Sequence, residues 1–352
     1  MKDTKIFAVS DRLDERDIEN LSFAAKAIQE GKLVAFPTET VYGLGANALD
    51  EIAVKSIFEA KGRPQDNPLI VHLSSVDDVE KYAYASENKK FAMISDLFPA
   101  PLTVILKKRD VIPDIVSANL DTAGFRIPIN RIARKLIELS GVPIAAPSAN
   151  LSGRPSPTKA EHVIEDMMGR ADVIIDGGRC DVGVESTIVT LATSTPMLLR
   201  PGGVSRETLE ARLGEVAVSS AVLSEMKSGE IAAAPGMKYR HYAPKAPVIL
   251  VIGNTEAAVR YINENVRGED CAVLCFDEES DLISANHVIP IGESSDLDAQ
   301  GRNVFDALRF TDSLDNGKVK RIYARTTGDF HGVGLAVYNR LLKASGFNVV
   351  RV

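Results

Sequence analysis

Short apolar runs alternate irregularly with amphipathic stretches along residues 1–213. A short apolar run between turn-forming residues predicts a strand, and apolar positions three and four residues apart predict a helix. These patterns predict strands at 33–36, 69–73, 102–107, 124–127, 143–145, 173–175 and 187–191, and helices at 17–30, 52–60, 91–97, 132–139, 158–168 and 207–213. The mixture predicts an α/β fold whose sheet is not purely parallel.

The pattern changes near residue 214. Residues 214–246 contain no long periodic element. Beyond them, strands predicted at 248–252, 272–276, 287–291 and 321–325 alternate with helices predicted at 255–266, 299–313 and 334–344. Such alternation predicts a second, small doubly wound domain. Because 352 residues are too many for one core, we expect domains at 1–213 and 247–352, joined by a linker at 214–246.

Polar, glycine-bearing segments stand beside several predicted strands. PTETVYGLGANA begins at Pro37, directly after an apolar run, and predicts a polar turn at a strand end. Four similar segments are KGRPQDNPLIVH from Lys61, DTAGFRIP from Asp121, APSANLSGRPSPT from Ala146 and GVEST from Gly183. Because ligands of open α/β sheets bind at strand ends, these loops predict one shared cleft.

The charge distribution favours a small anionic ligand. The net charge is −7 and the pI is about 5.4, which does not suit a protein that binds nucleic acid over its whole surface. Cations nevertheless gather in the polar loops and the linker: Lys61, Arg63, Arg126, Arg154, Arg200, Lys238 and Arg240. We therefore expect a locally basic cleft in an acidic protein.

The three cysteines indicate neither a disulfide framework nor a zinc site, because they are few and no histidine cluster lies near them. Cys271 and Cys275 lie in an apolar run and are expected to be buried strand thiols. No apolar run approaches the length of a membrane span, and the first residues lack an apolar signal core. We expect a cytoplasmic protein without a membrane partner.

The cleft candidates on helix ends and strands each allow two interpretations. Lys61 and Arg63 follow a predicted helix and either complement its C-terminus or grip a polyphosphate. His72 is either structural or directed into the cleft by strand alternation. Arg126 lies between apolar residues, so it needs a partner, either an internal carboxylate or the carboxylate of a substrate.

The loop candidates are equally open. Ser148, Asn150 and Ser152 form either a turn or a cradle for phosphate or adenine. Ser156 is either a helix N-cap or a phosphate ligand. Arg200 is either a surface residue or a phosphate clamp. The linker segment 238–242 is unusually rich in cations and aromatic residues, which suits either a packed interface or a lid over an anionic ligand.

Standard nucleotide motifs do not explain these segments. The chain has no GxxxxGK[ST] sequence and no GxGxxG sequence after a strand. Taken together and in order, however, PTETVYGLGANA, KGRP with NPLIVH, APSANLSG with SPT, GVEST and LRPG resemble the YrdC-domain family in its long two-domain form. The chain departs from the family pattern in having no Trp, in LFPAPLT at 97–103, and in Asn130 where a histidine is common.

This resemblance implies a twisted mixed sheet with helices and a concave ligand cleft, followed by a small Rossmann-like α/β domain. It implies a nucleotidyltransferase, an L-threonylcarbamoyladenylate synthase. Such an enzyme makes threonylcarbamoyl-AMP and pyrophosphate from L-threonine, bicarbonate and ATP. Its product would pass to a downstream transferase that modifies tRNA, so direct tRNA binding is not required. Mg²⁺ would share the phosphate charge, without a metal site built by the protein.

The resemblance also assigns site residues. The threonine pocket would comprise Thr40, His72, Arg126, Ala146 and Ser186. ATP would be held by Arg63, Asn67, Thr122, Ser148, Ser156, Arg200 and Tyr239. Lys61, close to the phosphates, and Arg63 would be the catalytic cations. Residues 238–242 would cover the loaded site.

Two alternatives remain. One is a non-catalytic RNA-binding protein on the same fold, against which the net charge argues. The other is an enzyme that uses carbamoyl-AMP on another acceptor, as in hydrogenase maturation. The zinc-finger and acyl-phosphatase segments of those proteins have no counterpart in this sequence.

Overall fold

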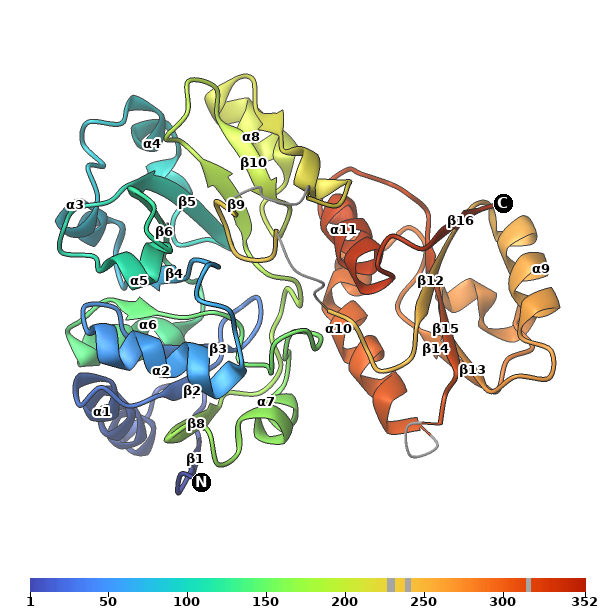
Figure 1. Cartoon of the computed structure of the whole chain (residues 1–352), viewed down its shortest axis with the longest axis horizontal. Coiled ribbons are helices and arrows are strands. Elements are labelled where there is room, and N and C mark those ends of the chain that lie inside the picture. Colours follow the sequence, from blue (N-terminus) through green and yellow to red (C-terminus); the bar gives the residue numbers. More distant parts are fainter. Residues whose placement is uncertain (227–231, 238–241, 315–317) are drawn as a thin grey trace.

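The computed structural model describes residues 1–226, 232–237, 242–314 and 318–352. These residues form two bodies that lie side by side, each built on its own sheet (Figure 1). The larger body contains roughly the N-terminal two thirds of the chain, and the smaller contains the C-terminal third.

The larger sheet is mixed. Within the described residues its strand order is β1-β8-β2-β3-β7-β4-β6-β5-β9-β10-β11. It contains antiparallel pairs such as β2–β3 and β5–β6 and parallel pairs such as β4–β6 and β5–β9. The strands are β1 (Lys5–Ala8), β2 (Val34–Phe36), β3 (Gly43–Asn47), β4 (Ile70–His72), β5 (Leu102–Lys107), β6 (Thr122–Arg126), β7 (Ile144–Ala145), β8 (Val173–Asp176), β9 (Thr187–Thr190), β10 (Met197–Arg200) and β11 (Ala217–Val218).

Helix α2 shows how local sequence sets the ends of a helix in the larger body. Asp50 caps α2 by accepting hydrogen bonds from the backbone of Ile52 and Ala53, and Gly62 ends the helix in the left-handed conformation (φ 62°). The helices are α1 (Glu15–Gln29), α2 (Glu51–Lys61), α3 (Val79–Tyr82), α4 (Lys89–Ile94), α5 (Asp114–Ser117), α6 (Arg131–Ser140), α7 (Ala160–Met167) and α8 (Arg206–Leu213), with 3₁₀ turns at Val76–Asp78, Ser95–Leu97 and Ser220–Val222.

The smaller body is a parallel α/β unit. Its strands β12 (Val248–Ile252), β13 (Cys271–Cys275), β14 (His287–Pro290), β15 (Arg321–Thr326) and β16 (Val349–Arg351) pair in the order β14-β13-β15-β12-β16. Helices α10 (Leu297–Ser313) and α11 (Gly334–Ala344) lie on the side of this sheet that faces the larger body, and α9 (Thr255–Asn265) covers the other side (Figure 1). A 3₁₀ turn spans Asp277–Leu282.

The predicted fold class is confirmed, and the predicted strands and helices are present within a few residues of their expected bounds. The prediction was wrong at PTETVYGLGANA, where strand β3 occupies the second half of the expected turn. The glycines there allow close packing, since a Cβ at Gly45 would lie 2.7 Å from the side chains of both Phe36 and Ile144. Strands β1, β10, β11 and β16 were not predicted.

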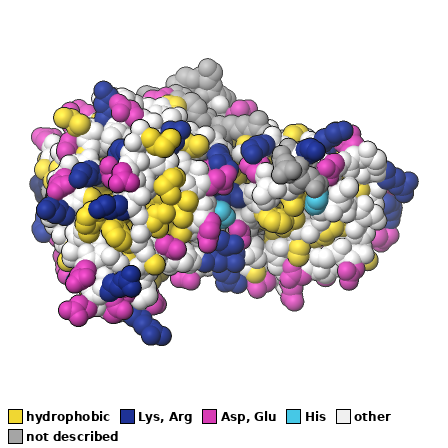
Figure 2. Space-filling view, turned by 90° about the horizontal axis from the view of Figure 1, so that it is seen from below, with side chains coloured by type: hydrophobic (Ala, Val, Ile, Leu, Met, Phe, Trp, Pro, Cys, Tyr) yellow, Lys and Arg dark blue, Asp and Glu magenta, His cyan; other side chains and the backbone are white. Residues whose placement is uncertain are grey.

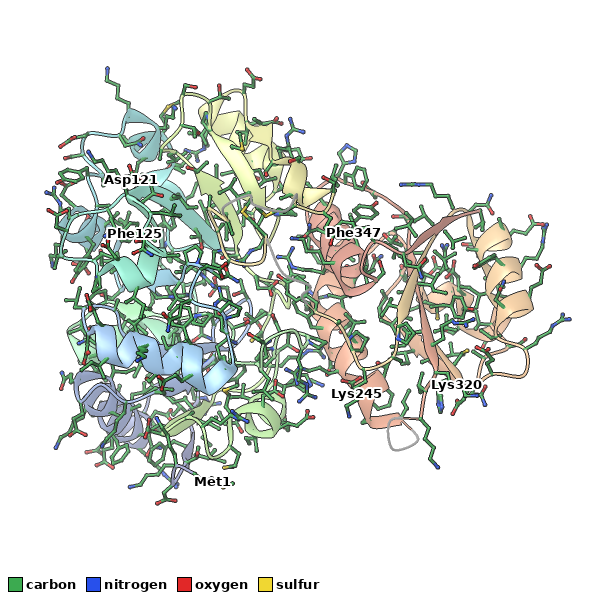
Figure 3. All side chains as sticks on the ribbon, in the orientation of Figure 1. Met1, Asp121, Phe125, Lys245, Lys320 and Phe347 are labelled. Atoms are coloured by element: carbon green, nitrogen blue, oxygen red, sulfur yellow. The ribbon has the colours of Figure 1, made fainter. Side chains whose placement is uncertain are left out.

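The cores follow the apolar pattern of the sequence. Phe125 lies inside the larger body, where its side chain is fully buried (Figure 3). Cys271 and Cys275 are free and buried in β13, as expected. On the face shown in Figure 2, Lys and Arg side chains are interspersed with Asp and Glu over both bodies.

Ion pairs join the two bodies. Arg309 of α10 binds Asp166 of α7 at 2.6 Å and also donates to the Pro155 carbonyl at 2.7 and 3.0 Å. Lys159 binds Asp306 of α10 at 2.7 Å. These partners flank the polar loop that follows β7, so the smaller body is attached beside the strand ends where a cleft was expected.

Candidate active site

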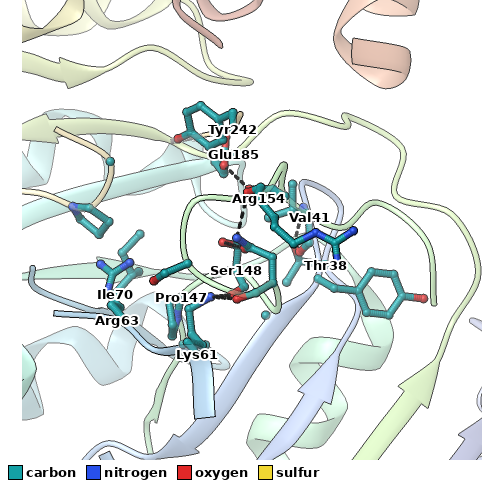
Figure 4. Close-up of a pocket in the computed structure, with 18 of the residues that line it drawn as sticks. Thr38, Val41, Lys61, Arg63, Ile70, Pro147, Ser148, Arg154, Glu185 and Tyr242 are labelled. Atoms are coloured by element: carbon teal, nitrogen blue, oxygen red, sulfur yellow. Dashed lines mark hydrogen bonds between the residues drawn. The ribbon is translucent and has the colours of Figure 1, made fainter. Parts of the chain in front are cut away.

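One pocket collects most of the polar segments that the sequence singled out (Figure 4). It is lined by the loop after β2, the end of α2, strands β4 and β6, the loop after β7, Glu185 before β9, the end of β10, and residues between β11 and β12. The lining residues are Thr38, Val41, Tyr42, Gly43, Lys61, Arg63, Ile70, His72, Arg126, Ala146, Pro147, Ser148, Asn150, Ser152, Gly153, Arg154, Ser156, Glu185, Arg200, Pro235, Gly236 and Tyr242.

Strand register brings His72 and Arg126 together, because they are partners in the β4–β6 pair. Arg126 is buried and uses one nitrogen, Nη2, to bind Glu39 at 2.7 Å and the Thr40 hydroxyl at 2.8 Å. Its Nε makes no hydrogen bond within the part of the chain that the structure describes. Of the two partners considered for Arg126, the internal carboxylate is present, and it is Glu39. Other N–H groups of the guanidinium are not used by Glu39 and could bind a ligand.

His72 lines the pocket as a neutral imidazole at pH 7. Burial, and then the positive charge of Arg126, lower the pKa of His72 to about 3. Its Nδ1 lies 3.2 Å from the Ile70 carbonyl. The ring is suited to hydrogen bonding rather than to carrying charge.

Lys61 holds the loop after β7. Its Nζ donates to the backbone carbonyls of Ser148, at 2.5 Å, and Asn150. Burial, followed by the charge of Arg63, holds the pKa of Lys61 well below its ordinary value. Arg63 donates to the Asn67 and Pro68 carbonyls at 3.2 and 3.1 Å. Both side chains therefore hold backbone segments in place at the pocket wall.

Ser156 bonds to a carboxylate instead of capping a helix. Its hydroxyl donates to Glu185 at 2.6 Å. Helix α7 begins at Ala160, with Lys159 in the N-cap position, so the N-cap interpretation of Ser156 was wrong. Ser148 also uses its hydroxyl locally, donating to the side-chain oxygen of Asn150 at 2.5 Å.

Glu185 is a buried anion surrounded by cations. Burial alone would raise its pKa, but Arg340, Arg200 and the Ser156 hydroxyl outweigh burial and hold the pKa at about 2. Figure 4 shows Glu185 and Tyr242 together on the wall opposite Lys61. Burial and the charge of Glu185 raise the pKa of Tyr242 to about 12, so its phenol is protonated at pH 7.

Arg200 is not a surface residue. It is only 7% exposed and donates to the Ser186 carbonyl at 3.0 and 3.1 Å and to the Ser186 hydroxyl at 3.2 Å. Burial lowers its pKa to about 10, a shift that the charge of Glu185 opposes. Arg200 therefore remains a cation at pH 7, on the pocket wall.

Four of the residues assigned from the resemblance lie outside the lining. Thr40 is held by Arg126, and Ser186 by Arg200 and by the Thr103 hydroxyl at 2.8 Å. Asn67 is buried, and its backbone carbonyl accepts a hydrogen bond from Arg63. Thr122 is the first residue of β6 and pairs with Lys107 of β5. Tyr239, and all of 238–242 except Tyr242, lie outside the described residues, so the lid over the site stays a prediction.

Two carboxylates that matter here, Glu39 and Glu185, were not selected from the sequence. Both stand inside quoted segments, PTETVYG and GVEST, directly beside residues that were selected. The available signal was an acidic residue among apolar and small neighbours near several cations, since a buried carboxylate requires a partner.

The pocket offers no dedicated metal cage. Among the described residues, no three His, Cys, Asp or Glu side chains come together in a group that could hold a metal ion. Glu185, which lines the pocket, and Glu39, the partner of Arg126, are each bound to an arginine. None of the described helices is long and apolar enough to cross a membrane.

The fold and the pocket define a class: a YrdC-like α/β protein with an added parallel α/β body. A family model described as "Telomere recombination" matches residues 26–202, and one described as "Threonylcarbamoyl-AMP synthase, C-terminal domain" matches residues 204–346. The chain belongs to the threonylcarbamoyl-AMP synthase family.

Relatives match over almost the whole chain. The threonylcarbamoyl-AMP synthase of Pyrococcus abyssi is 47% identical, over 99% of this chain and 100% of that protein. The Bacillus subtilis threonylcarbamoyl-AMP synthase is 45% identical over 97% of each protein. The crystal structure of Pyrococcus abyssi Sua5 complexed with L-threonine covers 99% of both chains, with a TM-score of 0.88 and 46% identity.

Proposed function

We propose that the protein is an L-threonylcarbamoyladenylate synthase, a nucleotidyltransferase that makes threonylcarbamoyl-AMP and pyrophosphate from L-threonine, bicarbonate and ATP. The observation that carries this proposal is a pocket rich in buried cations, in a chain that matches threonylcarbamoyl-AMP synthases over 97–100% of their length. The neighbouring structure that contains L-threonine supports threonine as one substrate.

Threonine would bind at the His72–Arg126 side of the pocket. Arg126 would bind the carboxylate with the donors that Glu39 leaves available, since a guanidinium has five N–H groups. Ala146, whose backbone nitrogen donates to the Ile70 carbonyl at 2.9 Å, would set the pocket floor. Thr40 would orient Arg126, from which its hydroxyl accepts a hydrogen bond. Ser186 would act indirectly, because its hydroxyl accepts a hydrogen bond from Arg200.

ATP would bind at the opposite side. Arg63, with Lys61 behind it, and Arg200 would balance the phosphate charge, and Ser148 and Ser156 would contact the nucleotide from the loop after β7. We keep Asn67, Thr122 and Tyr239 as proposed ATP residues. Mg²⁺ would arrive with the nucleotide and share its charge, and we assign it no protein ligands.

The chemistry requires positioning and charge neutralisation more than a strong base. The threonine amine takes up bicarbonate with loss of water to give a carbamate. A carbamate oxygen attacks the α-phosphorus of ATP, the bond from that phosphorus to the bridging oxygen breaks, and pyrophosphate leaves. The neutral imidazole of His72 would offer a hydrogen bond in this region without adding charge.

We also propose the biological setting. The product would pass to a transferase that places threonylcarbamoyl groups on tRNA, in the cytoplasm, where the substrates occur. Residues 1–213 would form the catalytic domain, 214–246 the linker and 247–352 the C-terminal domain.

The test is pyrophosphate release from ATP. Purified protein is incubated with bicarbonate, with and without L-threonine, and with L-serine and glycine as controls. We expect release only when threonine and bicarbonate are both present. Absence of release in every mixture would overturn the proposal and favour the RNA-binding alternative, which a titration of RNA against salt would then examine.

A further inference from the structure

Helix α11 presents three buried polar side chains to the larger body. Asn339, Arg340 and Lys343 are 2%, 0% and 7% exposed. Each donates to a backbone carbonyl of the chain between β10 and the smaller sheet: Asn339 to Val222 at 2.7 Å, Arg340 to Pro201 at 2.9 Å, and Lys343 to Gly236. Burial of such polar groups is tolerated only when they form hydrogen bonds. The polar side chains on this face of α11 therefore match the carbonyl groups of the segment they contact.

Arg340 reaches from this interface to side chains that line the pocket. Its Nε binds Glu185 Oε2 at 2.6 Å, and Glu185 Oε1 accepts the Ser156 hydroxyl at 2.6 Å. The guanidinium also lies over the ring of Tyr242, 5.5 Å from its centroid. Glu185, Ser156 and Tyr242 all line the pocket, whereas Arg340 does not. One residue of the smaller body thus contacts two lining side chains directly and a third through Glu185.

Glu185 is an unfavourable charge for a pocket that receives a polyanion. At pH 7 its carboxylate would repel the phosphates of ATP unless a cation neutralised it. The charge of Arg200 also favours the ionised form of Glu185, but the hydrogen bonds of Arg200 within the described residues go to backbone and hydroxyl oxygens. Arg340 makes the direct ion pair with Glu185.

We propose that Arg340 is a positioning residue for nucleotide binding: by neutralising Glu185 from the C-terminal domain, it allows the Ser156 wall of the pocket to accept ATP. This inference rests on the proposed function for the identity of the ligand. Threonine is a zwitterion of no net charge and would bind on the Arg126 side, so it is much less affected by the charge of Glu185.

The test separates the two Michaelis constants. In Arg340→Met we expect KM for ATP to rise roughly tenfold or more, the scale of a lost charge-assisted hydrogen bond. KM for threonine should stay within about twofold. Arg340→Lys should recover part of the loss, because it restores the charge but not the fork that spans Glu185 and Pro201.

Arg325→Met is the matched control. Arg325 belongs to the same body, is 1% exposed, and pairs with Glu279 at 2.8 Å, but neither residue lines the pocket. The control should lose thermal stability and leave both KM values within about twofold. An unchanged KM for ATP in Arg340→Met, or the same kinetic pattern in Arg325→Met, would overturn the proposal.

A double variant keeps the test decisive if Arg340→Met does not fold. Glu185→Gln combined with Arg340→Met removes both charges, and replacing both members of a buried ion pair is often tolerated. We expect the double variant to fold and to bind ATP within about threefold of the wild type. A double variant that folds but binds ATP as poorly as Arg340→Met, or at least tenfold less tightly than the wild type, would refute the neutralisation.

Calorimetric titration with ATP distinguishes a failure of the proposed synthase activity from a failure of the proposed role of Arg340. If the wild type released no pyrophosphate but bound ATP, the proposed function would fail while the role of Arg340 could still be measured on the same variants. If the wild type bound no ATP, the role of Arg340 would fail with it.

Discussion

At the scale of single residues, Arg126 has partners on two sides. Its Nη2 binds Glu39 and Thr40 inside the protein, its Nε has no hydrogen-bond partner among the described residues, and the residue lines the pocket. The sequence identified Arg126 as a residue in need of a partner and left two partners open. The structure shows that Glu39 is the internal partner. In the proposed function, the carboxylate of threonine is the second partner.

Arg126→Ala should weaken threonine binding by roughly 10- to 100-fold, the scale of hydrogen bonds to a charged group. It should also lower the free energy of unfolding by about 3 kcal/mol, because Glu39 would be left buried without its cation. Calorimetric titration with threonine and urea unfolding measure the two effects.

Arg134→Ala is the comparison, since Arg134 lies on α6 and does not line the pocket. It should leave threonine affinity unchanged. A folded Arg126→Ala variant with wild-type threonine affinity would remove Arg126 from the threonine site.

At the scale of elements, α11 carries a lysine in an unusual environment. Burial, and then the charges of Arg340 and Arg200, lower the pKa of Lys343 from 10.5 to about 7. Between these two values the folded protein holds fewer protons than the unfolded chain. Unfolding therefore takes up a proton there, and this residue makes stability rise with pH from about 7 to about 10.5.

Lys343→Met should abolish that contribution. We expect the difference in free energy of unfolding, wild type minus Lys343→Met, to become more favourable to the wild type by up to about 1.4 kcal/mol per pH unit above pH 7. Urea unfolding at pH 6 to 9 measures it. Lys320→Met, at an exposed lysine of the same body, is the control. A difference between wild type and Lys343→Met that does not change with pH would show that Lys343 keeps its proton on folding.

At the scale of the whole molecule, ion pairs hold the two bodies together. Arg309 is one of these residues, and its guanidinium binds Asp166 and the Pro155 carbonyl across the interface. Arg154 also binds Asp166, so Asp166 would keep one cation if Arg309 were lost.

Arg309→Met should cost about 3 kcal/mol, the lower end for a broken buried pair, and should split or broaden the thermal unfolding transition as the bodies uncouple. Differential scanning calorimetry measures both. Arg260→Met, which removes an exposed pair with Glu256 on α9, should change stability by less than about 1 kcal/mol. One sharp transition in Arg309→Met, at the wild-type temperature, would show that other contacts dominate the interface.

The elements, the fold class, the position of the pocket and the family could all be predicted from the sequence. Apolar periodicity determined the strands and helices and the α/β class, because side-chain burial enforces a period of 2 or 3.6 residues. The polar loops at strand ends indicated one pocket, and most of their selected residues line it, including Lys61, Arg126 and Ser148. The ordered segments indicated the family, which the full-length matches confirm.

Only the tertiary structure decided which charges neutralise one another. Arg126 meets a carboxylate 87 positions away, and Arg340 meets one 155 positions away in the other body. Local pattern determines the type of an element and which face it buries, but an ion pair depends on strand order and on how the bodies dock. The sequence therefore determined where the pocket forms, and the packing of α11 against it decided the charge that the pocket presents.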